Sequence, residues 1–112
     1  MEKEEQLVCA AIGYLNKNKD LGVTYKNFSC EGRWIILDDF DIFSNDQGGG
    51  THYDTCGIPR DIIDLNKPFP PVKSGYEYFE DPRAEKLPAF TRAILRIAWY
   101  LYIIYTSSME AY

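Results

Sequence analysis

The C-terminal quarter of the chain constrains the fold most, because it carries a helical pattern whose second half is apolar on nearly every side. Pro88 suits the first position of a helix, and large apolar side chains follow it at helical spacing: Phe90, Ile94, Ile97, Leu101 and Ile104. The pattern predicts a helix from about residue 88 to 106. Arg92 and Arg96 lie on the opposite stripe of its first half, whereas residues 98–105 offer no polar stripe.

Such a helix needs cover on more than one side, and a sheet of three or four strands covers only one side of it. We expect the helix centre to be core. The alternative is a surface for a second copy of the chain, a homodimer or larger homo-oligomer of a structural or accessory protein, assembled through Trp99, Tyr102 and Tyr105. The apolar stretch at 97–105 is far shorter than the roughly 20 residues that span a bilayer, so no membrane association is expected.

The rest of the chain predicts an α+β fold. Leu7, Val8, Ala11, Ile12 and Leu15 form one stripe of an amphipathic N-terminal helix at residues 3–16. Residues 23–29 and 33–37 favour strands joined by a short loop at 30–32, and further strands are expected at 51–55 and 58–65. A Pro-rich segment at 66–76 should be extended. The fold class is therefore an N-terminal helix, a small and mainly antiparallel sheet of three to five strands, and a long C-terminal helix packed on one sheet face.

Length, composition and cysteine content limit the class of protein to which the chain can belong. The chain has 112 residues, 46% of them hydrophobic and 26% charged, which predicts a single globular domain over residues 1–112. The first six residues, Met-Glu-Lys-Glu-Glu-Gln, lack the features of a secretory signal, and three cysteines without a C-x-x-C pair suit free thiols. We therefore expect a cytoplasmic protein.

Charge is concentrated in the middle of the chain. The formal net charge is −5, and residues 38–64 hold seven aspartates and a single base, Arg60. Aspartates are common in turns, where they bond to nearby backbone N–H groups, so one interpretation is a set of strand ends decorated for solubility. The other is that loops at one end of the sheet gather them into a negative patch that binds a basic protein.

We take the second interpretation as the main functional hypothesis. The protein would be a non-enzymatic acidic binding protein that occludes a basic surface of its partner, as inhibitors of the toxin-immunity and phage anti-defence type do. A nucleic-acid-handling enzyme has such a surface, whereas this chain has the wrong charge to bind nucleic acid itself. The residues expected at the interface combine carboxylates with aromatic anchors: Asp38, Asp39, Phe40, Asp41, Phe43, Asp46, Tyr53 and Asp54.

Catalytic interpretations receive less support from the sequence. Asp39 and Asp41 follow an apolar strand, where carboxylates can hold Mg²⁺ or Mn²⁺, and this leaves a small metal-dependent phosphoryl- or glycosyl-transfer enzyme as the alternative. His52, Asp54 and Cys56 are the right types for nucleophilic catalysis, but three neighbours on one strand diverge.

Cys9, Cys30, His52 and Cys56 do not have the spacing of a zinc motif. We therefore predict no catalytic residues, no metal site and no cofactor.

Overall fold

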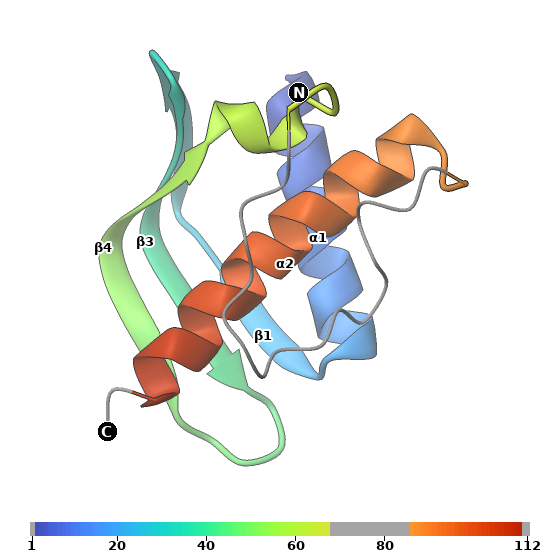
Figure 1. Cartoon of the computed structure of the whole chain (residues 1–112). Helices are drawn as coiled ribbons and strands as arrows, with labels where there is room; N and C mark the ends of the chain where they lie inside the picture. The colour runs from blue at the N-terminus through green and yellow to red at the C-terminus, as the bar shows by residue number, and fades with distance from the viewer. Residues whose placement is uncertain (1, 68–85, 111–112) are drawn as a thin grey trace.

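The computed structural model describes residues 2–67 and 86–110, which form two long helices, a 3-10 helix and a four-stranded antiparallel sheet. In chain order the elements are α1 (Lys3–Asn18), β1 (Leu21–Thr24), β2 (Asn27–Glu31), β3 (Trp34–Ser44), β4 (Gly50–Pro59), η1 (Arg60–Ile63) and α2 (Ala89–Glu110). Figure 1 shows two layers, with the sheet on one side and both long helices on the other. The predicted fold class is confirmed.

The long strand β3 is the centre of the sheet. β4 pairs with it from Trp34 to Phe43 and so occupies one edge, while β1 and β2 pair with it one after the other and share the opposite edge. Gly32 and Arg33 form the turn between β2 and β3, and Gly32 has a φ of 57°, which glycine adopts at little cost. The turn is one residue shorter than the sequence predicted.

The side-chain alternation of β3 changes phase at Asp39. Ile35 and Leu37 point to the core before this residue, and Phe40 and Ile42 point to the core after it. Asp39 has a φ of 49° and interrupts the ladder between β3 and β4, although the pairing on either side keeps one register. A left-handed residue of this kind is uncommon outside glycine, and aspartate and asparagine tolerate it best.

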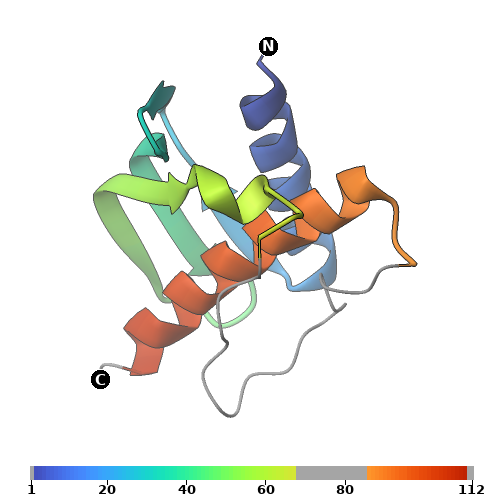
Figure 2. The same ribbon diagram turned by 45° about the horizontal axis from the view of Figure 1, so that its top comes forward.

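Both long helices cover the same face of the sheet and contact each other (Figures 1 and 2). α1 packs near β1, and α2 packs near β4 and η1. The core between the layers is built from all of these elements, with its largest fully buried side chains being Trp99, Phe40, Leu7, Leu15, Ile35, Leu37, Ile42, Ile58, Leu95, Ile97 and Leu101. The centre of α2 is therefore core, as expected for its apolar pattern.

Other boundary predictions also differ from the structure, and the single strand expected at 23–29 is divided into β1 and β2. The strand expected at 58–65 is wrong, because β4 ends at Pro59 and the chain turns into η1. The aspartates at 38, 39 and 41 do not lie in a loop at a strand end, because β3 continues through them to Ser44. Most of the Pro-rich segment at 66–76 lies outside the described residues. Among the helices that the structure describes, none combines the length and hydropathy needed to cross a bilayer.

Candidate binding face

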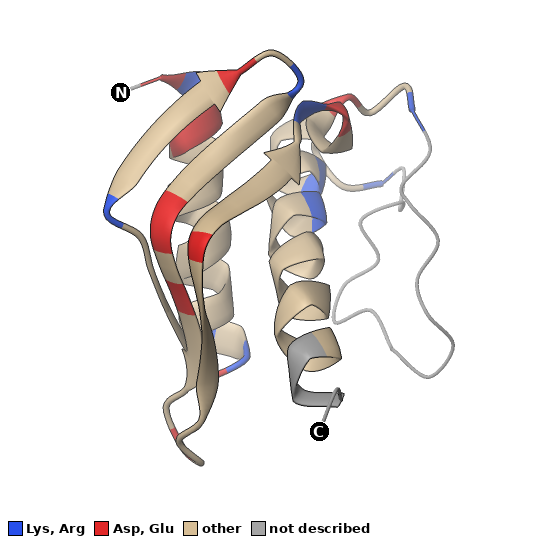
Figure 3. Cartoon of the chain, turned by 90° about the vertical axis from the view of Figure 1, so that its left-hand side faces the viewer, with Lys and Arg blue, Asp and Glu red and all other residues tan. Residues whose placement is uncertain are grey.

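The side of the sheet that faces away from the helices, here called the outer face, collects four of the seven aspartates of residues 38–64. Asp38, Asp39 and Asp41 come from β3 and Asp54 comes from the adjacent β4. In Figure 3 the acidic positions of the two strands lie side by side near the middle of the sheet. The sequence predicted a patch assembled from loops, whereas the structure assembles it on two paired strands, which hold it more rigidly.

The phase change in the strands explains why so many carboxylates share this face. Asp38 and Asp39 are consecutive, yet neither points into the core, because the left-handed backbone of Asp39 turns the chain between them. The same change occurs on β4, where Asp54 and Thr55 are both exposed. The Thr55 hydroxyl donates to Asp38 at 3.5 Å across the two strands.

His52 lies in the centre of this acidic group. Its Nδ1 is 2.9 Å from Asp41 Oδ1, and its Nε2 is 3.3 Å from Asp54 Oδ1 and 3.9 Å from Asp39 Oδ1. The hydrogen bond to Asp41 raises the pKa of His52 above its ordinary value, and the Asp54 carboxylate adds to this. The imidazolium form is thus more stable here than in a free histidine, and where it forms it offsets one of the four negative charges.

Exposed aromatic rings lie at both ends of the outer face. Trp34 is 41% exposed and covers Gly57 on the neighbouring strand, while Phe43 is 38% exposed and lies between Gly22 and Gly50. In each case the ring occupies the space left by a glycine without a side chain. Phe43 was predicted from the sequence as an anchor, and Trp34 was missed because its strand is apolar on both faces.

The other predicted interface residues do not join this group. Phe40 is fully buried, and the half-buried Tyr53 packs beside it with a ring-centroid separation of 6.4 Å, so Phe40 cannot serve as an exposed anchor. Asp46 lies in the hairpin tip between β3 and β4. In α2, Trp99 is fully buried and stacks on Tyr102. Tyr102 and Tyr105 are both partly buried against the core, so the predicted oligomer surface is at most partly accessible.

The combination of His52 with Cys56 and the convergence of the cysteines with His52 are not formed. Cys56 points into the core while His52 points to solvent, because the phase change lies between them, and burial raises the pKa of the Cys56 thiol to about 11. The four cysteine and histidine side chains do not converge, since Cys9 is exposed, Cys56 is buried, and Cys30 and His52 belong to different clusters. Oxygen and nitrogen atoms of Asp39, His52 and Asp54 lie within 4.8 Å of one another, but exposed carboxylates gather in this way without a cation, so we assign no metal to them.

Comparison with known proteins found no relative of this chain. No protein-family model matches the chain, and no curated protein and no solved structure is significantly similar to it. The chemistry of the outer face therefore carries the functional argument alone.

Proposed function

We propose that the protein binds a basic surface of another protein through the outer face of its sheet and thereby occludes that surface. The observation that carries the proposal is the convergence of four aspartates from two paired strands onto one solvent face. A group of like charges held on a rigid sheet attracts a partner of opposite charge over a distance and raises the rate of association.

The charge around this face supports the proposal. Between Leu21 and Pro59 the chain has six carboxylates and only two bases, Lys26 and Arg33. Arg33 lies in the turn at one end of the sheet, with its guanidinium 5.8 Å from the Trp34 ring, and so it does not neutralise the acidic centre. A basic partner would bring the charges that the outer face lacks.

The exposed aromatic side chains can supply binding free energy, which long-range attraction between charges supplies only in part. Charge steers an encounter, whereas aromatic side chains that become buried contribute much of the free energy of binding. Trp34 and Phe43 are nine residues apart on one strand, about 30 Å at the usual rise, so the face has the length of an ordinary protein interface. We place the acidic group at the centre of this interface and the two rings near its ends.

The class of partner follows from the same chemistry. Proteins that handle nucleic acids present Lys and Arg to phosphate, and a carboxylate-rich face competes for those side chains. An inhibitor or immunity protein of such an enzyme is the function we favour, and the three free thiols are consistent with action in a reducing cytoplasm.

Affinity capture with matched charge variants tests this proposal. The tagged protein is used to capture partners from lysates at about 50 and about 300 mM salt, where screening of exposed charges differs strongly. A variant with Asn in place of Asp39, Asp41 and Asp54 is compared with a control that has Asn in place of Asp46, Asp61 and Asp64. Both variants change the net charge from −5 to −2, and all six positions come from residues 38–64.

A basic partner that is retained at low salt by the wild type and the control, but not by the outer-face variant, would support the proposal. Equal loss in both variants would show that only net charge matters, and equal retention in both would place the interface elsewhere. Far-UV circular dichroism verifies that each variant is folded.

A further inference from the structure

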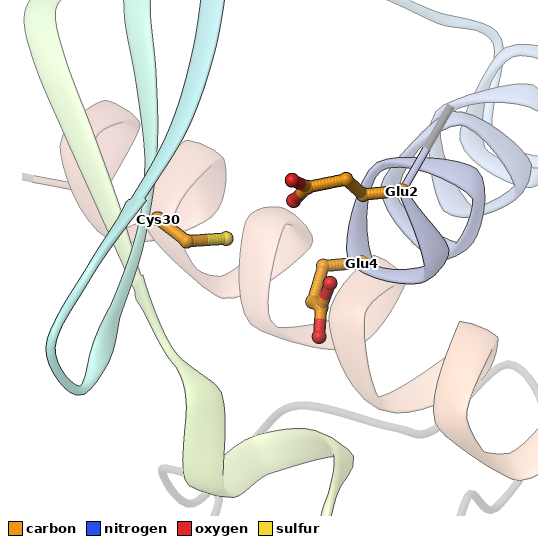
Figure 4. A group of neighbouring side chains, drawn as sticks. All are labelled: Glu2, Glu4 and Cys30. Atoms are coloured by element: carbon orange, nitrogen blue, oxygen red, sulfur yellow. The ribbon is translucent and has the colours of Figure 1, made fainter.

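A second cluster of ligand-type side chains lies on the inner side of the sheet, away from the outer face. It joins Glu2 and Glu4 at the start of α1 to Cys30 on β2. Figure 4 shows the Cys30 sulfur and the Glu2 carboxylate pointing toward each other across the space between strand and helix, with Glu4 beside them. One oxygen of each glutamate and the Cys30 sulfur all lie within 4.8 Å of one another.

The donor set is specific in its chemistry. The cluster contains one thiol and two carboxylates, which are ligand types that Zn²⁺ uses. The thiol is 26 or more residues away from the carboxylates in the sequence, so the fold brings them together. Around a tetrahedral zinc ion with bonds of about 2.0–2.3 Å, neighbouring donor atoms lie about 3.5 Å apart, so small side-chain rotations would close the cluster on a cation.

Local contacts fix the backbone of Glu2 and orient the Glu4 carboxylate. Glu2 precedes α1 and its carbonyl accepts a hydrogen bond from the Gln6 amide at 3.0 Å, which fixes the start of the helix. The Arg60 guanidinium lies 3.5 Å from Glu4 Oε1 and donates to the Gly32 carbonyl at 3.2 Å. Carboxylates that ligate metals commonly have such an outer partner, which orients the carboxylate and leaves its second oxygen free.

We propose that Glu2, Glu4 and Cys30 bind a zinc-type divalent cation, with solvent completing its coordination, and that the cation fastens the start of α1 to β2. The proposal is independent of the binding function of the outer face. The expected contribution is to stability, because a cation that binds only the folded chain stabilises it by mass action.

Titration of the reduced protein with Co²⁺ tests the site, since Co²⁺ substitutes for Zn²⁺ and a Co²⁺–thiolate bond gives a near-ultraviolet charge-transfer band. We expect one equivalent of Co²⁺ to produce this band and Zn²⁺ to remove it. Cys30→Ser should abolish the band, whereas Cys9→Ser should retain it, because Cys9 is exposed on α1 and outside the cluster. The double variant E2Q/E4Q should bind Co²⁺ about 10-fold or more weakly, since even the loss of an outer partner of a metal ligand costs that much.

Glu31→Gln is the matched control for the glutamates, since Glu31 is the exposed neighbour of Cys30 and lies outside the cluster. A thermal melt gives the second readout: saturating Zn²⁺ should raise the Tm of the wild type and of Glu31→Gln, but not that of Cys30→Ser. A band that survives Cys30→Ser or an unchanged affinity in E2Q/E4Q would overturn the proposal. So would the absence of a band at about 1 mM Co²⁺, a concentration at which even weak extracellular Ca²⁺ sites are occupied by their own cation.

Discussion

The imidazole Nδ1 of His52 lies 2.9 Å from Asp41 Oδ1, and the two residues are direct partners across the β3–β4 pair. Because the strands fix their backbones opposite each other, the contact does not depend on a flexible loop. Asp54 and Asp39 approach the other ring nitrogen, so the only histidine of the chain is surrounded by carboxylates on three sides. The charge of the outer face is therefore linked to the protonation of one side chain.

We predict that His52 titrates above its ordinary pKa of 6.5, because the Asp41 hydrogen bond stabilises the imidazolium. A raised folded-state pKa means that this stabilisation is fully present below the unfolded pKa and is lost as pH rises through the folded pKa. NMR titration of the His52 ring protons measures this pKa without ambiguity, because the chain has one histidine. Asp41→Asn should lower the pKa, and a wild-type pKa at or below 6.5 would contradict the prediction.

Binding of a basic partner should weaken as pH falls through the His52 pKa, because each imidazolium removes one negative charge from the acidic group. His52→Gln should remove this part of the pH dependence while leaving the four aspartates in place. The measurement is the Kd of the captured partner at constant ionic strength between about pH 8 and pH 5.5, the range in which histidine titrates. An affinity that rises on acidification in the wild type would speak against the outer face as the interface.

The two glycines beside Phe43 should respond differently to substitution by alanine. At Gly50 an added Cβ would meet the Ile42 carbonyl oxygen at 2.6 Å, which is backbone of the central strand, whereas at Gly22 it would meet only the end of the Phe43 ring. Gly50→Ala should therefore cost about 1–3 kcal/mol, as overpacking does, and Phe43→Ala should not rescue it. Gly22→Ala should cost less, and its cost should vanish in the Phe43→Ala background, as measured by urea unfolding in a double-mutant cycle.

Arg96 should be a structural residue of α2. It is 3% exposed, and its Nη1 donates to the carbonyls of Ile62, Asp64 and Lys67 at 3.1–3.4 Å, so it ties the end of η1 to the helix. Arg96→Met should lower the free energy of unfolding by about 3 kcal/mol or more, because each hydrogen bond to a buried charge contributes about 1.5–3 kcal/mol. Lys86→Met, at an exposed position, should change it by less than about 0.5 kcal/mol.

Local patterns predicted the two long helices and most of the sheet, whereas the backbone conformation of Asp39 escaped them. The apolar spacing of residues 88–106 was enough to predict α2, since helical periodicity is local. Strict alternation in β3 from Ile35 would have placed Asp39 and Asp41 in the core, and only the left-handed φ of Asp39 reverses this. No sequence rule identifies which aspartate adopts that conformation.

The same phase change separates His52 from Cys56. Alternation along a regular β4 would place His52 and Cys56 on one face, whereas the structure puts them on opposite faces. The cluster of Glu2, Glu4 and Cys30 was also invisible in the sequence, because it depends on how α1 meets β2 in three dimensions. Tertiary geometry, and not residue type, decided the composition of both sites.

The three thiols should react with an alkylating reagent in an order set by their surroundings. The thiolate is the reactive form, so burial, which raises the pKa of Cys56 to about 11, should make Cys56 unreactive until the chain unfolds. Cys9 is exposed and should react first; Cys30 is partly buried, its pKa is raised mainly by that burial, and it should react more slowly. Mass spectrometry of protein treated with iodoacetamide in the presence of a chelator measures the three rates, and labelling of Cys56 as fast as Cys9 would contradict its place in the core.

The same labelling experiment also tests the cation site. When Zn²⁺ replaces the chelator, the labelling of Cys30 alone should become slower, because the bound cation occupies its thiolate. This measurement does not require Co²⁺.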